Sequence, residues 1–320
     1  MNFRSLGKTG FLVSEVGFGC WQLGGEGWGA FHQEDALAAV RRALDLGINL
    51  FDTAPVYGFG RSEELLAKVL RNDAGKVVVV SKAGLVWDER RRVVHDNRPE
   101  SLARSLEASL KRLRMETLDV LLLYWPDPAV PLAASAQALE SFRKAGKIRA
   151  WGLSNFAAAD VLSLDSLVSG DWAGPVIEYP VNVLRSHAEE YRESARAGRE
   201  LLEATGRRGW GYLAFDVLGR GLLAGGYDEA THFGKRDIRS RDVRYGRGEF
   251  ERHLARVGEL RALACAIGVP TAAVAIRAVL GIPGLTSCLV GMRNPRQVEE
   301  CVSACGVTLP EGLLGWAAEQ

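Results

Sequence analysis

The sequence predicts an α/β fold of the (β/α)8 or TIM barrel type, in which eight parallel strands alternate with helices and close into a ring. Short apolar runs alternate with longer amphipathic stretches from one end of the chain to the other. This pattern is typical of parallel strands joined by crossover helices. The length of 320 residues suits one such barrel, which commonly needs about 250 residues. We therefore expect residues 1–320 to form a single barrel domain.

Eight short apolar runs are expected to be the barrel strands. In chain order they are residues 16–20, 48–52, 77–82, 118–123, 149–153, 176–178, 211–215 and 287–290. Helical periodicity is found in the stretches between and after them, for example over residues 34–46, 99–113 and 249–267.

Three other segments lie outside this repeat. Residues 3–13 contain two short strand-like runs around a turn bounded by glycines, which predicts a hairpin that could plug the barrel floor. Residues 187–208 are long and charged and are expected to be a helix. Residues 232–248 are rich in Arg, Asp and Gly, and we expect them to form a mobile loop at the barrel rim.

Composition excludes several functional classes. The formal net charge is +1, so the chain lacks the one-sided basic excess expected of a protein that binds nucleic acid or a membrane surface. No stretch approaches the roughly 20 apolar residues of a membrane span, and a soluble cytoplasmic protein is expected. The five cysteines show no CxxC spacing, so free thiols are expected and no metal site is predicted.

Polar residues that could do chemistry follow three successive predicted strands. Asp52 and Tyr57 follow the second strand, Lys82 the third, and Tyr124 the fourth. Reactive groups of such barrels lie at the C-terminal ends of the strands, so these residues are expected to converge. Lys82 would lower the pKa of Tyr57 from about 10, and Asp52 would keep Lys82 charged. Taken singly, Asp52 could instead be a helix-capping acid and Lys82 an exposed charge.

The run GEGWGA at residues 25–30 fits a loose GxGxxG/A dinucleotide-binding pattern. Such a turn should join a strand directly to a helix, whereas here other residues intervene on both sides. We interpret it as a flexible first rim loop in which Trp21 and Trp28 line a substrate pocket.

These features together resemble the aldo-keto reductase family over nearly the whole chain. The resemblance is carried by Asp52, Tyr57 and Lys82, and by RSEE at 61–64, SLEASLKRL at 105–113, WPD at 125–127, GLSNF at 152–156, GRGLL at 219–223 and VGMR at 290–293. It implies a nicotinamide-dependent enzyme in which Tyr57 protonates a substrate carbonyl while hydride arrives from the cofactor.

The same resemblance implies further site residues. Ser154 and Asn155 would hold the carboxamide, with Glu178 beside them, and the Phe215 ring would stack nearby. The adenosine end would be lined by Gly291, Arg293, Gln297 and Glu300, and Trp125 would join the substrate pocket. Because Arg293 could pair bidentately with a 2′-phosphate, NADPH is expected rather than NADH. A surface Arg that binds nothing is the alternative.

Several positions depart from the family pattern. Tyr124 stands where the family usually has a His that polarises the carbonyl, and a phenol can still donate a hydrogen bond. Glu178 replaces a Gln, so an ionised side chain could accept from the carboxamide but could not donate. Asp216 follows Phe215 in place of a Ser, and Cys301 stands where Asn is common.

Three functions are therefore considered. The first is an NADPH-dependent reductase of a small carbonyl compound. The second is a non-redox isomerase, epimerase or lyase that uses Tyr57, Tyr124 and Glu178 as acid and base. The third is a catalytically weak, cofactor-binding regulatory protein. Substrate, reaction direction and oligomeric state do not follow from the sequence.

Overall fold

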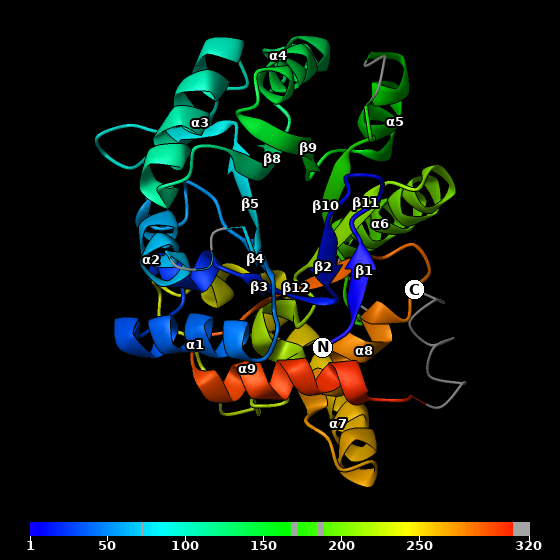
Figure 1. The fold of residues 1–320 in the computed structure, drawn as a ribbon. Coiled ribbons are helices and arrows are strands. Elements are labelled where there is room, and N and C mark those ends of the chain that lie inside the picture. Colours follow the sequence, from blue (N-terminus) through cyan, green and yellow to red (C-terminus); the bar gives the residue numbers. More distant parts are fainter. Residues whose placement is uncertain (72, 74, 168–171, 185–188, 310–320) are drawn as a thin grey trace.

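The computed structural model describes residues 1–71, 73, 75–167, 172–184 and 189–309. Its centre is a closed barrel of eight parallel strands, arranged around the ring in the order in which they occur in the chain (Figure 1). The last strand pairs with the first, so the ring has no free edge. The predicted (β/α)8 fold is confirmed.

All eight predicted strands are present, with ends that differ from the prediction by at most two residues. They are β3 (Val16–Gly19), β4 (Leu50–Asp52), β5 (Val78–Ala83), β8 (Leu118–Tyr124), β9 (Ile148–Ser154), β10 (Val176–Pro180), β11 (Gly211–Phe215) and β12 (Ser287–Gly291). The strands are almost entirely buried because helices cover the outside of the ring and side chains fill the inside.

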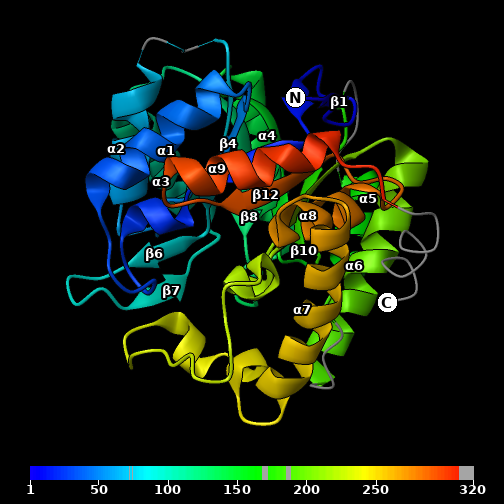
Figure 2. The ribbon, with the colours of Figure 1, turned by 90° about the horizontal axis from the view of Figure 1, so that it is seen from below.

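The helices surround the barrel on its outer face, as Figures 1 and 2 show. They are α1 (Gln33–Asp45), α2 (Arg61–Leu70), α3 (Pro99–Leu113), α4 (Leu132–Lys144), α5 (Ala158–Leu167), α6 (Glu189–Arg208), α7 (Glu249–Ala266), α8 (Thr271–Leu280) and α9 (Pro295–Val302). Helix α3 illustrates why they form: Pro99 occupies its first turn, and Leu102, Leu106 and Leu110 lie on its buried face. The helix expected over residues 187–208 corresponds to α6, which begins at Glu189 and ends at Arg208. His187 lies outside the described residues.

Two hairpins accompany the barrel. Strands β1 (Phe3–Ser5) and β2 (Leu12–Ser14) pair antiparallel, and Leu6 and Val13 pack into the lower end of the barrel interior. This confirms the predicted floor plug. The second hairpin, β6 (Leu85–Trp87) with β7 (Val93–His95), follows β5 and was not expected from the sequence.

Residues 225–248 form a strap along the rim, which we call the rim strap (yellow in Figure 2). It carries two 3-10 turns, η3 (Ile238–Arg241) and η4 (Val243–Tyr245), and each begins at an aspartate whose side chain accepts a backbone N–H. The backbone N–H of Ile238 donates to the carbonyl of Gly27 at 2.9 Å, so the strap reaches the first rim loop. A loop was correctly expected over residues 232–248; its contacts with the first rim loop were not foreseen, and its mobility stays a prediction.

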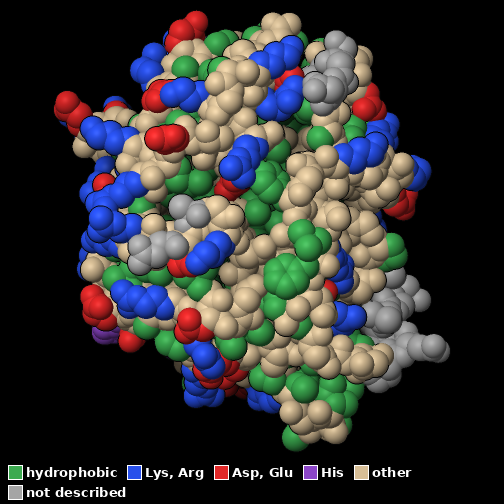
Figure 3. Space-filling view, in the orientation of Figure 1, with side chains coloured by type: hydrophobic (Ala, Val, Ile, Leu, Met, Phe, Trp, Pro, Cys, Tyr) green, Lys and Arg blue, Asp and Glu red, His purple; other side chains and the backbone are tan. Residues whose placement is uncertain are grey.

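The surface carries both signs of charge. On the face shown in Figure 3, Lys and Arg side chains are interspersed with Asp and Glu. Within the part of the chain that the structure describes, no single helix is long and apolar enough to cross a membrane. Helices α7 and α8 meet that requirement only as a pair, and they are bent by 98° relative to each other.

Candidate active site

A cavity of about 1700 Å3 opens at the C-terminal ends of the barrel strands. Its floor carries Asp52 from β4, Tyr57 from the turn after β4, Tyr124 from β8 and Glu178 from β10. The barrel therefore brings together side chains that lie far apart in the sequence, at the end where such folds place their chemistry.

Lys82, on β5, is buried against two residues of the cavity floor, Asp52 and Glu178. Its ammonium forms ion pairs with the carboxylates of Asp52 and Glu178, the second at 3.2 Å, and donates to the Thr53 carbonyl at 3.2 Å. Its side chain is fully buried. Burial alone would lower the pKa of Lys82, but the two carboxylates raise it above its usual value. We call Asp52, Lys82 and Glu178 the lysine cluster.

Two phenols flank the lysine cluster. The Lys82 Nζ lies 5.3 Å from the ring centre of Tyr57 and 5.5 Å from that of Tyr124, and the two phenols lie close enough to interact electrostatically. Burial raises the pKa of Tyr57 well above its usual value, and the Tyr124 phenol and the two carboxylates nearby raise it further. The expected net lowering of the Tyr57 pKa is therefore wrong: burial dominates, and the Lys82 ammonium is shared by two carboxylates.

Glu178 connects the lysine cluster to the next strand. Its Oε1 accepts from the Ser154 hydroxyl at 3.3 Å, and that hydroxyl accepts from the Asn155 amide at 3.0 Å. Asn155 has a φ of 66°, a left-handed conformation that Asn tolerates better than most residues. Burial and the Asp52 charge raise the pKa of Glu178 to about 8, against the lowering effect of Lys82.

Aromatic side chains form part of the cavity wall. The Trp21 ring stacks with Tyr57 at a centroid distance of 5.9 Å and meets the edge of Trp28 at 5.0 Å. Trp125 is partly exposed beside Tyr124, and Phe215 lies at the end of β11. All of these line the cavity, so an apolar wall stands next to the polar floor.

The residues expected at the adenosine end line the same cavity on the β12 side. They are Gly291, Arg293, Gln297, Glu300 and Cys301. The Arg293 guanidinium donates to the backbone carbonyls of Trp28, at 3.1 Å, and Ala30. Arg293 therefore ties the end of β12 to the first rim loop, a contact that the sequence did not suggest.

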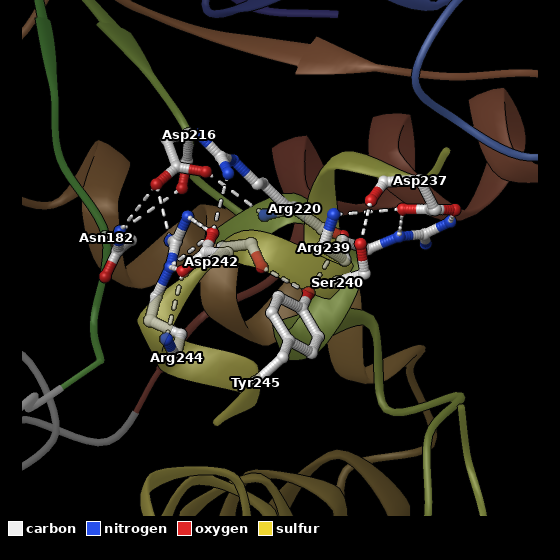
Figure 4. Close-up of polar contacts among 10 residues, drawn as sticks. Asn182, Asp216, Arg220, Asp237, Arg239, Ser240, Asp242, Arg244 and Tyr245 are labelled. Atoms are coloured by element: carbon white, nitrogen blue, oxygen red, sulfur yellow. Dashed lines mark hydrogen bonds and ion pairs between the residues drawn. The ribbon is translucent and has the colours of Figure 1, made fainter. Parts of the chain in front are cut away.

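An ion-pair network in the rim strap was missed at the sequence level. Figure 4 shows Arg244 between Asp216 and Asp242, with Nη1–Oδ2 and Nη2–Oδ2 distances of 2.6 and 2.7 Å. Arg220 also pairs with Asp242, at 2.8 Å. The alternation of Arg and Asp in RDIRSRDVR at residues 236–244 was the signal that could have revealed it.

The arrangement suits proton transfer next to a bound small molecule. Two phenols and two carboxyls surround one ammonium, and the groups can exchange hydrogen bonds with a carbonyl oxygen placed above them. Among the described residues, no three His, Cys, Asp or Glu side chains gather in a way that could hold a metal ion. The chemistry offered by these side chains is therefore acid–base chemistry.

Comparisons with known proteins agree with the fold. The model of the "Aldo/keto reductase family" matches residues 15–312 of this chain. The chain is similar to aldo-keto reductase YhdN of Bacillus subtilis, with 33% identity over 315 residues, which is 97% of this chain and 90% of that protein. It is 28% identical to a putative voltage-gated potassium channel subunit beta of Schizosaccharomyces pombe, over 94% of this chain and 87% of that protein. The structure of a glycerol dehydrogenase from Gluconobacter oxydans superimposes with a TM-score of 0.86 at 33% identity, covering 99% of this chain and 94% of that chain. The chain therefore belongs to the aldo/keto reductase family of oxidoreductases.

Proposed function

We propose that this protein is an NADPH-dependent reductase of a small carbonyl compound, acting in the cytoplasm as one barrel domain. The observation that carries the proposal is the convergence of Tyr57, Tyr124 and the lysine cluster on the floor of one large cavity. The 33% identity to a glycerol dehydrogenase supports a small, hydroxylated substrate.

The cavity residues suit a nicotinamide dinucleotide. Ser154, Asn155 and Glu178 present hydrogen-bonding groups at one end, and Arg293 and Gln297 do so at the other. Within the described part of the chain, the buried Nε1 of Trp28 and Oε1 of Gln22 have no hydrogen-bond partner, and a ligand in the cavity could satisfy them. Arg293 supports NADPH over NADH because its guanidinium could bind a 2′-phosphate. When bound, NADPH supplies the hydride for the reduction.

In this proposal Tyr57 is the proton donor. Its raised pKa keeps the phenol protonated at neutral pH, so the proton is available to the carbonyl oxygen of the substrate. The positive charge of Lys82, close to the ring, stabilises the phenolate that remains after transfer. Tyr124 orients the carbonyl by donating a second hydrogen bond, and Trp21, Trp28 and Trp125 exclude water from it.

A second candidate is non-redox acid–base chemistry on the same barrel. It is favoured by the two neighbouring phenols, Tyr57 and Tyr124, and by Glu178, whose pKa of about 8 would let it give or take a proton near neutral pH. Such an enzyme would enolise a carbonyl compound without consuming the cofactor. A third candidate, a regulatory protein that binds the cofactor but barely turns it over, has support from the similarity to a putative potassium channel subunit.

The test begins with a fluorescence titration of the purified protein with NADPH and NADH, which uses its eight tryptophans. An absorbance assay of reduced-cofactor oxidation against a panel of aldehydes and ketones follows. Tight NADPH binding with oxidation supports the reductase. Cofactor binding without oxidation of NADPH favours the second or third candidate. Failure of both cofactors to bind rejects the proposal.

Variants at the floor of the cavity separate chemistry from folding. Tyr57→Phe and Lys82→Met should each lose at least about a hundredfold in turnover, the usual contribution of a positioned proton donor. Circular dichroism should remain that of the unsubstituted protein. Full activity in both variants would reject the assigned roles.

A further inference from the structure

The lysine cluster contains two carboxyl groups and one ammonium. Asp52 and Glu178 both pair with Lys82, and all three side chains are at most 6% exposed. Ionised carboxylates that lie close together in a buried site repel each other, and one cation compensates only one of them. Protonation of one of the two carboxyl groups therefore stabilises the lysine cluster.

Glu178 is the carboxyl that faces the nicotinamide end of the cavity. Its Oε1 accepts from the Ser154 hydroxyl at 3.3 Å, and the Ser154 hydroxyl accepts from Asn155. A carboxamide ligand there needs a donor for its oxygen and an acceptor for its NH2 group. A protonated Glu178 offers both, in a shape close to that of glutamine, whereas an ionised Glu178 offers acceptors only.

The two oxidation states of the cofactor differ in the charge of the nicotinamide ring, which in our proposal lies beside Glu178. Oxidised nicotinamide is a cation, which favours an ionised carboxylate beside it, and reduced nicotinamide is neutral, which favours a neutral acid. We propose, on the basis of the cofactor use proposed above, that Glu178 is a proton-linked binding group: it takes up a proton when NADPH binds and stays ionised beside NADP+.

Four of the five other titratable groups around Glu178 do not compete for this role. They are Asp52 on β4, Tyr57 after β4, Lys82 on β5, Tyr124 on β8 and, beyond Asp52, Cys20. Burial raises the pKa of both phenols and of the Cys20 thiol, and the carboxylates raise the pKa of Lys82. These four groups therefore keep their protons between about pH 7 and 9, while the pKa of Glu178 of about 8 lies within that range.

The test measures protons rather than turnover. NADPH and NADP+ are titrated separately into the protein by calorimetry, in two buffers with different ionisation enthalpies, at several values between about pH 7.5 and 9.5, above the phosphate pKa of about 6. For NADPH we expect net uptake of a fraction of one proton, and a Kd that rises up to about tenfold per pH unit above about pH 8. NADP+ should instead release a fraction of one proton at the lower end of this pH range, where free Glu178 is still largely protonated, and its Kd should not rise with pH.

Glu178→Gln should abolish the proton uptake and make the NADPH Kd independent of pH. Glu193→Gln, which removes a charge from an exposed side chain on the cavity rim, is the matched control and should behave like the unsubstituted protein. Thermal melting checks that both variants fold. If Glu178→Gln does not fold, the difference in proton uptake between NADPH and NADP+ in the unsubstituted protein still decides the question.

Equal proton uptake with NADPH and NADP+, or uptake that persists in Glu178→Gln, would overturn this inference and leave the proposed reductase in place. Failure of both cofactors to bind would overturn the proposed function and this inference together. The two failures are therefore distinguishable in one set of titrations.

Discussion

The Nη1 atom of Arg244 lies 2.6 Å from the Oδ2 atom of Asp216, although the two residues are 28 positions apart in the sequence. Asp216 follows the end of β11, and Arg244 belongs to the rim strap. Arg244 is 1% exposed and pairs with Asp242 as well. Because the same strap is hydrogen-bonded to Gly27 in the first rim loop, this ion pair fixes one end of a bridge across the rim of the cavity.

Arg244→Ala should therefore loosen the rim strap. Asp242 would keep its ion pair with Arg220, but Asp216 would lose its cation, and removing one partner of a buried ion pair costs about 3 kcal/mol or more. We expect faster limited proteolysis within residues 225–248 and cofactor binding weakened at least tenfold. Arg241→Ala, which truncates an exposed side chain of the same strap, is the control and should change neither. Equal proteolysis patterns for the two variants would show that the ion pair does not hold the strap.

Tyr124→Phe tests the residue that replaces the usual His. The substitution removes the hydroxyl that, in our proposal, donates to the substrate carbonyl next to Tyr57. We expect kcat/KM to fall by about a hundredfold to a thousandfold, the usual effect of losing one donor at a developing oxyanion. The Kd for NADPH should stay within about twofold, since the proposed role concerns substrate. Unchanged kcat/KM would remove Tyr124 from the mechanism.

Most of the fold could be predicted because each barrel strand is buried on both faces and is therefore an apolar run in the sequence. The β6–β7 hairpin escaped prediction for the opposite reason. Val93 and Val94 are 43% and 54% exposed, and a three-residue strand with exposed side chains has no periodicity that distinguishes it from a loop.

The candidate site could be predicted only in part. The placement of Asp52, Lys82 and Tyr124 at strand ends follows from the rule that side chains at the C-terminal rim converge. That Glu178 shares Lys82 could not be foreseen, because β5 and β10 are not neighbours in the ring and meet only through their inward-facing side chains. The pKa of Tyr57 is raised chiefly by burial, and Glu178 adds to that rise, so the error in its expected direction came mainly from a degree of burial that the sequence does not show.

The stability of the protein should depend on pH through Glu178. Its pKa is raised from 4.5 to about 8 on folding, so the folded state holds the proton more strongly than the unfolded chain. The stabilisation is complete below about pH 4.5 and is lost as pH rises through about 8, by up to about 1.4 kcal/mol per pH unit. Urea unfolding of Glu178→Gln should lack this slope. An identical pH profile for both proteins would contradict the assignment.

Arg293→Ala tests cofactor selection at the other end of the cavity. Loss of charge-assisted hydrogen bonds to a 2′-phosphate should weaken NADPH binding by about tenfold to a hundredfold, with little change for NADH. Arg296 lies three residues further on, in the first turn of α9, and its side chain is 86% exposed, so Arg296→Ala should leave both affinities unchanged. If Arg293→Ala weakens the binding of NADPH and NADH equally, the loss comes from the contacts of Arg293 with Trp28 and Ala30 and not from a contact with the 2′-phosphate.

Gly152→Ala tests the packing that places Ser154 beside Glu178. Gly152 pairs with Val176 across β9 and β10, and a Cβ there would lie 1.8 Å from the Val176 carbonyl oxygen. The two strands would have to separate, so we expect a loss of about 3 kcal/mol in urea unfolding and weaker cofactor binding. Gly258→Ala, on the exposed face of α7 with open space around the Cβ position, should instead gain up to about 1 kcal/mol. Equal stability of Gly152→Ala and the unsubstituted protein would mean that β9 and β10 can move apart without loss of stability. The hydrogen bond between Ser154 and Glu178 would then not depend on this close approach.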